Sequence, residues 1–157
     1  MKHVFAKVVI SVFALLIFGI FVEKVYSHCQ IPCGIYDDQA RFAQIAEDIV
    51  TIEKSMKEIT RLSGAKKKDM NQIVRWVNNK DHHAESLGET VTYYFMAQRI
   101  KPVKAGQGKA YDKYVKEVSL LHRMLVHSMK AKQSTDMAHV SALRSLLAEF
   151  EEMAKTQ

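Results

Sequence analysis

The sequence predicts an all-α protein, an antiparallel up-and-down four-helix bundle, and three observations lead to this fold class. The 157 residues include only two Pro and six Gly, too few for the turns that a β-sandwich or barrel needs about every 8–12 residues. Apolar residues make up 48% and charged residues 25%, which is the balance of an ordinary globular domain. Apolar side chains also recur in steps of three and four along four segments, as amphipathic helices require.

The first two predicted helices cover residues 42–59 and 73–100. Gly64 offers a stop to the first helix, and the second ends near Ile100 because Pro102 disfavours helical geometry at Lys101. Trp76 and Phe95 are interpreted as core side chains. The other inward-facing residues that we expect are Phe42, Ile45, Ile49, Ile52, Met56 and Ile59 on the first helix, and Ile73, Val77, Ala84, Leu87, Val91 and Tyr94 on the second.

The third and fourth predicted helices follow a loop at residues 101–108. Ser134, Thr135 and Asp136 supply N-cap chemistry for the fourth helix. Because the connections between the four amphipathic helices are short, neighbours should run antiparallel, and residues 37–157 are predicted to form the bundle. The inward residues that we expect are Tyr111, Tyr114, Val118, Leu121 and Leu125 on the third helix, and Val140, Leu143, Leu147 and Phe150 on the fourth.

Residues 1–27 are predicted to be a signal peptide that is cleaved from the rest of the chain. Lys2 and Lys7 give a positive start, and residues 8–22 carry no charge. That apolar run is shorter than the roughly 18 residues of a membrane span, but it fits the apolar core of a secretory signal. Cleavage following Ser27 would export the protein, to the periplasm or outside the cell, and make His28 its amino terminus. The alternative is an uncleaved membrane anchor.

The charge of the chain predicts a mildly basic, solvated surface. The formal net charge is +6, and the leader accounts for part of it, because it holds three Lys and one Glu. The remaining +4 is spread over helices that also carry acidic residues, and the one clear basic block is Lys66–Lys68. A one-sided basic stripe with interleaved aromatic residues is absent from the sequence, so no nucleic-acid partner is expected. After cleavage no stable membrane association is expected either.

The residues with distinctive chemistry are 28–36, His-Cys-Gln-Ile-Pro-Cys-Gly-Ile-Tyr, which contain both cysteines of the chain. Cleavage before His28 would bring together a free amine, an imidazole, the amide nitrogen of Cys29, and the thiols of Cys29 and Cys33. The amine and the next backbone nitrogen form a five-membered chelate ring, and Pro32 and Gly34 favour the turn that returns Cys33 to the same metal. Two nitrogens and two thiolates in a plane favour square-planar Ni(II) over tetrahedral zinc.

This nine-residue segment closely resembles the nickel hook, H-C-x-x-P-C-G-x-Y, of the nickel superoxide dismutases. The resemblance implies a homohexamer of four-helix bundles, with one nickel ion per subunit and superoxide as the substrate. The metal ligands would be His28, Cys29 and Cys33, with the His28 imidazole on the axis in the oxidised state. Tyr36 would order water over the open face and restrict access. A maturation protease would expose His28, and cycling between Ni(II) and Ni(III) would convert superoxide to O₂ and H₂O₂.

Two hypotheses of different class follow from these residues. The first is a nickel-dependent superoxide dismutase. The second is an exported, non-enzymatic binding or metal-carrier module with a Cys29–Cys33 disulfide, which is the ordinary use of two cysteines in an exported protein. A disulfide between such close residues would constrain the unfolded chain very little.

The sequence of the helices does not identify side chains that would support the axial histidine of the hook. Some family members place Glu and Arg side chains behind the axial histidine, whereas this chain has Ala43, Gln44 and Glu47 on the first helix and Arg75 on the second. These positions cannot be assigned supporting roles. The remaining histidines are predicted to lie on the surface or to pack between helices, namely His82, His83, His122, His127 and His139.

Overall fold

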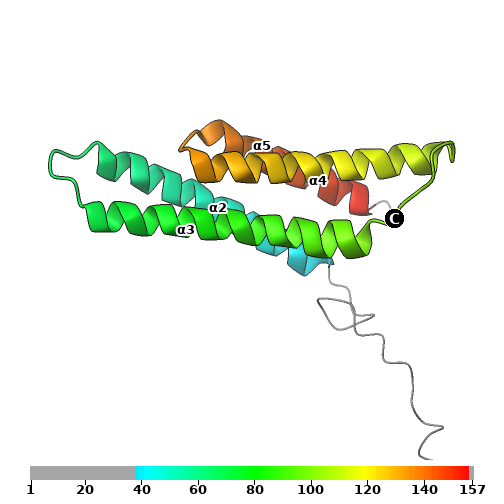
Figure 1. Cartoon of the computed structure of the whole chain (residues 1–157), viewed down its shortest axis with the longest axis horizontal. Helices are drawn as coiled ribbons and strands as arrows, with labels where there is room; N and C mark the ends of the chain where they lie inside the picture. The colour runs from blue at the N-terminus through cyan, green and yellow to red at the C-terminus, as the bar shows by residue number, and fades with distance from the viewer. Residues whose placement is uncertain (1–37, 156–157) are drawn as a thin grey trace, which may run out of the picture. The chain divides into compact units, whose positions relative to one another are not determined.

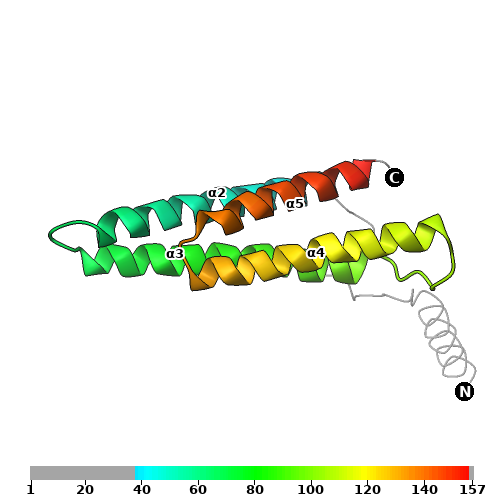
Figure 2. The same ribbon diagram turned by 90° about the horizontal axis from the view of Figure 1, so that it is seen from above.

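The structure, a computed structural model, describes residues 38–155, and this part of the chain is an all-α bundle (Figures 1 and 2). Its helices are α2 (Asp38–Ser63), α3 (Met70–Glu89), η1 (Thr90–Arg99), α4 (Lys109–Gln133) and α5 (Met137–Lys155). Helix α3 continues without a break into η1, a π-helix, so the two act as one long helix. The four-helix count of the prediction is confirmed.

The helices run up and down in chain order. Helix α2 packs mainly against α3 and α4 against α5, and contacts of α3 with α4 and of α2 with α5 close the ring. Figure 1 shows the α2–α3 connection at one end of the bundle and the η1–α4 connection at the other. Each helix therefore lies beside the next along the chain and antiparallel to it, as short connections dictate.

The core confirms the predicted faces of the first and fourth helices. All six expected residues of α2 are buried, and Ile45, Ile52 and Met56 are fully enclosed. All four expected residues of α5 are buried as well. Along these helices the period of three and four residues places every apolar side chain on one stripe, so burying the stripe fixes the orientation of the helix.

The prediction for the third helix was wrong in part. Of the five expected residues of α4 only Leu121 is buried, while Tyr111 and Tyr114 are half-exposed and lie against each other with ring centroids 6.3 Å apart. Tyrosine can leave its polar edge in water, so an aromatic stripe need not mark the core. The residues that α4 buries are Glu117, Leu120, Leu121, Met124, Ser128 and Ala131.

Trp76 also departs from the prediction, whereas Met56 and Phe95 are buried as expected. The Trp76 ring is half-buried, and the Lys54 ammonium lies 5.8 Å from its centroid. A cation above an indole ring is attracted by the ring quadrupole. Ile73 and Val77, at the same end of α3, are half-buried too.

The π-helix η1 was not predicted. Its wider turn is closed at the end by a hydrogen bond from the Ile100 amide to the Phe95 carbonyl oxygen, at 2.9 Å, which is the five-residue spacing of a π-turn. Consecutive residues Tyr94 and Phe95 are both buried there. The Phe95 ring lies 5.1 Å from that of Phe42 and 5.0 Å from that of Phe150, so the π-helix contributes to an aromatic cluster joining η1, α2 and α5.

Buried polar side chains connect the helices. The Lys80 side chain, in a residue only 3% exposed, donates to the carbonyl oxygen of Ala131 at 2.7 Å and also to that of Lys132. A cation at the carboxyl end of α4 satisfies carbonyls that the helix leaves unpaired. Between α2 and α3, the Asp48 carboxylate contacts His83 Nδ1 at 2.7 Å and accepts from the Ser86 hydroxyl at 3.0 Å.

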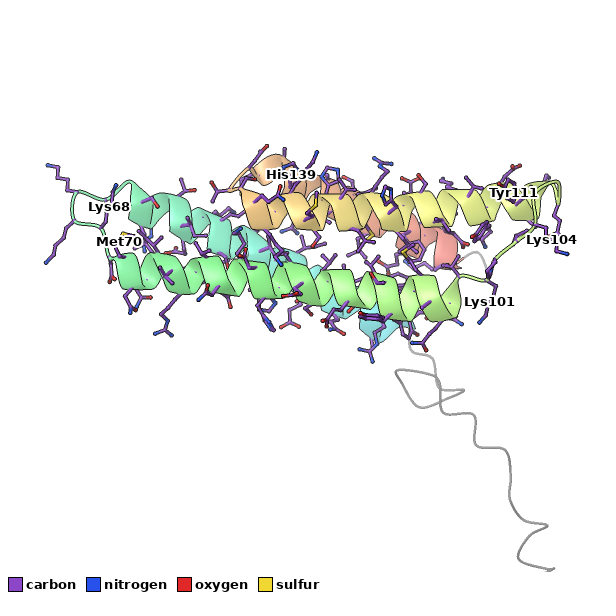
Figure 3. The ribbon with its side chains drawn as sticks, viewed as in Figure 1. Lys68, Met70, Lys101, Lys104, Tyr111 and His139 are labelled. Carbon is purple, nitrogen blue, oxygen red and sulfur yellow. The ribbon has the colours of Figure 1, made fainter. Side chains whose placement is uncertain are left out.

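Basic side chains lie at both ends of the bundle. The block Lys66–Lys68 is exposed in the connection before α3, and the helix begins after Asp69, whose carboxylate accepts from the Gln72 amide at 3.1 Å. Figure 3 shows Lys68 at this end and Lys101 and Lys104 at the opposite end. Among residues 38–155, no helix is both long enough and apolar enough to cross a membrane.

Candidate metal centre

The residues predicted to bind nickel lie outside the part of the chain that the structure describes. These are His28, Cys29 and Cys33, and Tyr36 lies outside it too. The first described residue is Asp38, two positions after Tyr36 and five after Cys33. The structure therefore shows how the bundle holds the segment to which the hook is covalently attached.

Asp38 is held by two side chains from the end of η1. The Arg99 guanidinium donates from Nη2 to Oδ2 at 2.7 Å and from Nε to Oδ1 at 2.8 Å. The Tyr94 hydroxyl donates to Oδ1 at 2.6 Å. A bidentate pair with arginine fixes both the position and the plane of a carboxylate. We call the cluster of Asp38, Tyr94 and Arg99 the α2 clamp.

The charges of the α2 clamp are set by burial and by these hydrogen bonds. Burial acts to raise the pKa of the Asp38 carboxyl, but hydrogen bonds from Arg99 and Tyr94 and the charge of Arg99 outweigh it, so the pKa lies below its ordinary value. Burial and the bond to Asp38 raise the pKa of the Tyr94 hydroxyl. At neutral pH the clamp is thus a carboxylate that accepts from a guanidinium and a protonated phenol.

The Tyr94 ring is fixed from several sides. The residue is 2% exposed, and the Phe95 ring meets it edge-on with centroids 5.0 Å apart. The Arg41 guanidinium lies 5.6 Å from the Tyr94 ring centroid. Because Arg41 follows Asp38 on the same turn of α2, the ring contacts α2 through both its hydroxyl and its face. Sequence reasoning missed this cluster, since nothing in the spacing pairs Asp38 with a residue 61 positions away.

The structure shows the surroundings of Ala43, Gln44, Glu47 and Arg75, the four helix positions to which the sequence assigns no role. Gln44 accepts a hydrogen bond from Arg41 at 2.8 Å. Ala43, Glu47 and Arg75 are exposed. Among the described residues, the α2 clamp is the contact network that holds the start of α2, the helix that follows the predicted hook in the chain.

The other histidines have the surroundings that the sequence predicted, with one addition. His82 and His122 are exposed, and His83 packs between α2 and α3 on Asp48. The addition is that His127 and His139, on different helices, lie together, with their Nδ1 atoms 3.3 Å apart. In residues 38–155, no group of three or more His, Cys, Asp or Glu side chains could hold a metal.

A helical bundle whose first helix is preceded in the sequence by a His-Cys-x-x-x-Cys segment, with the donor types that bind transition metals, is typical of a small helical metalloprotein. Residues 23–157 match the family model of the nickel-containing superoxide dismutases. The matched range takes in all the described helices and also residues 28–36, and the chain belongs to this family. No curated protein and no solved structure matches the chain.

Family membership decides between the two hypotheses. The chain is a nickel-dependent superoxide dismutase, an oxidoreductase that uses nickel and acts on superoxide. The alternative, a non-enzymatic carrier with a Cys29–Cys33 disulfide, is not favoured, because the match covers most of the chain and comes from an enzyme family.

Proposed function

We propose that this dismutase holds its nickel ion through His28, Cys29 and Cys33, with one ion per subunit, and that Tyr36 controls access to it. The observation that carries the proposal is the family match over residues 23–157, which includes the only two cysteines of the chain. Thiolates and nitrogens are the donors that a d⁸ ion prefers in a planar arrangement. Residues 28–33 carry such a donor set, with two thiols, an imidazole and, after cleavage, a free amine.

Each residue of this segment has a separate task. When bound, nickel supplies one-electron chemistry between Ni(II) and Ni(III), by which two superoxide ions and two protons become O₂ and H₂O₂. Cys29 and Cys33 provide anionic thiolates, which favour the higher oxidation state. His28 would hold the ion through its amine and its imidazole. The Tyr36 hydroxyl would order water beside the ion and keep out anions larger than superoxide.

The α2 clamp positions the segment that carries these ligands. Asp38 is five residues from Cys33 in the sequence, so the connecting chain limits how far the hook can lie from the first turn of α2. Three hydrogen bonds between 2.6 and 2.8 Å hold that residue against η1. A metal site performs best when the residues beside its ligands are themselves held by packing and hydrogen bonds.

Processing and assembly complete the proposal. A protease that cleaves following Ser27 creates the amine ligand at His28, and the leader exports the chain to the periplasm or outside the cell. The mature bundles assemble into a homohexamer. Exposed apolar residues on the described helices support assembly, and they include Val50, Val74, Tyr93, Val115 and Met129.

The decisive experiment changes the ligands and the amino terminus separately. Cys29→Ser and Cys33→Ser should each abolish both dismutase activity and the thiolate-to-nickel absorption band, since a neutral hydroxyl is a poor donor for this metal. One extra residue before His28 should also prevent nickel binding while circular dichroism shows an intact bundle. Near-normal turnover in a Ser variant, or full activity in the extended chain, would show that the ligands are elsewhere.

A further inference from the structure

Two histidines from different helices meet on the surface of the bundle. His127 lies on α4 and His139 on α5, and the structure places their Nδ1 atoms 3.3 Å apart with ring centroids at 5.4 Å. Both side chains are half-buried, so one edge of the pair is open to solvent. Figure 3 shows His139 near the start of α5, where this helix runs alongside α4.

The separation of the two nitrogens fits joint coordination better than a direct hydrogen bond. Hydrogen bonds from N–H donors usually span about 2.7–3.2 Å, so 3.3 Å is long for one. Two imidazole nitrogens that each lie about 2.0–2.1 Å from one tetrahedral ion stand about 3.3–3.4 Å apart. The 3.3 Å between Nδ1 of His127 and Nδ1 of His139 matches this ligand-to-ligand distance, so neither helix has to move for both nitrogens to bind one ion.

The protonation state of the pair also suits metal binding. Burial lowers the pKa of His127, and the neighbouring His139, Lys130 and Arg123 lower it further. A neutral imidazole keeps the lone pair that a metal takes, whereas an imidazolium has none. The positive charges of Lys130 and Arg123 repel a cation bound nearby. A site with two protein ligands beside these charges should therefore have modest affinity.

Both ligands stand on rigid supports. On α4, Met124 and Ser128 on either side of His127 are buried, and on α5 Val140 follows His139 into the core. Ligands on packed helices keep their spacing, so less conformational entropy is lost when a metal binds. A bound ion would in turn link α4 to α5 close to their connection.

We propose that His127 and His139 form a second metal site, for a divalent transition ion of the Zn²⁺ type, independent of the nickel hook. The two Nδ1 atoms are the protein ligands. Water completes the coordination on the open edge, because in the described part of the chain no third His, Cys, Asp or Glu side chain joins the pair to make a three-ligand group.

The test is a zinc titration of the full chain carrying Cys29→Ser and Cys33→Ser, which removes the hook thiolates. The imidazole resonances of His127 and His139 should shift together in proton NMR, with one midpoint. Thermal unfolding should move up by about 3–6 °C at zinc ten times above the dissociation constant. A response from only one of the two imidazoles, or from neither, would overturn the proposal.

Single variants in the same background identify the ligands. His127→Ala and His139→Ala should each weaken zinc binding at least about tenfold, as expected when one of two ligands is lost. The matched control is His122→Ala, an exposed histidine on the same helix as His127, and it should leave zinc binding unchanged. Unchanged affinity in either of the first two variants, or an equal loss in the control, would refute the site. These readouts do not depend on dismutase activity, so the result is separate from the proposed nickel ligands.

Discussion

The α2 clamp gives the sharpest quantitative prediction, for the variant Tyr94→Phe. The substitution keeps the buried ring and removes only the hydroxyl that donates to Asp38 at 2.6 Å. A hydrogen bond to a charged group contributes about 1.5–3 kcal/mol, and we expect the lower end because the Asp38 side chain is 30% exposed. A loss of about 1.5 kcal/mol corresponds to a fall of about 5 °C in the unfolding temperature of a domain this size.

The pH dependence of this loss follows from the carboxylate. Because the pKa of Asp38 is lowered in the fold from its ordinary value of 3.8, the clamp contributes stability above that value and loses it as the pH falls through the folded pKa. Urea unfolding followed by circular dichroism should therefore separate Tyr94→Phe from the wild type fully at pH 7. The difference should shrink below about pH 3.8.

The matched control for this prediction is Tyr93→Phe. Tyr93 is the adjacent residue of η1 but is 51% exposed, so the loss of its hydroxyl should change stability by less than about 0.5 kcal/mol. Tyr94→Phe should also release nickel faster to a chelator, because the first turn of α2 would fray beside the hook. Equal stability of the two variants at pH 7 would refute the clamp.

Three further predictions concern the hook, a basic loop at one end of the bundle, and the core. His28→Ala should keep nickel, through the amine and both thiolates, but its turnover should fall steeply. The axial-nitrogen splitting of its electron paramagnetic resonance signal should vanish. Tyr36→Phe should keep the metal and its spectrum, with a smaller loss of rate and weaker exclusion of azide. The double variant Lys101→Gln and Lys104→Gln removes two positive charges from the exposed loop after Arg99. It should lower kcat/KM for superoxide about two- to fourfold at low salt and flatten the salt dependence of kcat/KM. The control is the double variant Lys66→Gln and Lys68→Gln at the other end of the bundle. Lys80→Met should destabilise the bundle by about 2–4 kcal/mol in urea unfolding, since it leaves the Ala131 carbonyl without its buried partner.

The parts of the fold that were predictable are those governed by local period and capping. The stripe from Phe42 to Ile59 fixes α2, because those residues can all be buried only in one helical orientation. The segment Ser134–Asp136 is predicted to supply the cap of the last helix, and the Asp136 carboxylate accepts from the Ala138 amide at 2.9 Å. Both signals lie within a few residues of the feature that they predict.

The features that sequence reasoning missed depend on distant partners. The π-helix places Tyr94 and Phe95 in the core together. The contacts of Phe95 with Phe42 and Phe150 from other helices stabilise this arrangement. The spacing along the sequence does not pair His127 with His139, because the two residues lie on different helices. A signal was available for this pair, since the two residues flank the short connection at residues 134–136 between antiparallel helices.

In the proposed site, the α2 clamp would also link the stability of the bundle to the affinity for nickel. The nine residues of the hook are too few to bury a core, so in the proposed site we expect the metal to stabilise their conformation. The helices owe their order to apolar burial instead, and the two parts are joined by the chain at residues 37 and 38. Because thermodynamic coupling is reciprocal, a substitution in Asp38, Tyr94 or Arg99 that weakens nickel binding must lose, by the same amount, the stabilisation that nickel gives to the first turn of α2. Hydrogen exchange at the start of α2, measured with and without nickel, should therefore change in the wild type and respond much less to the metal in Tyr94→Phe.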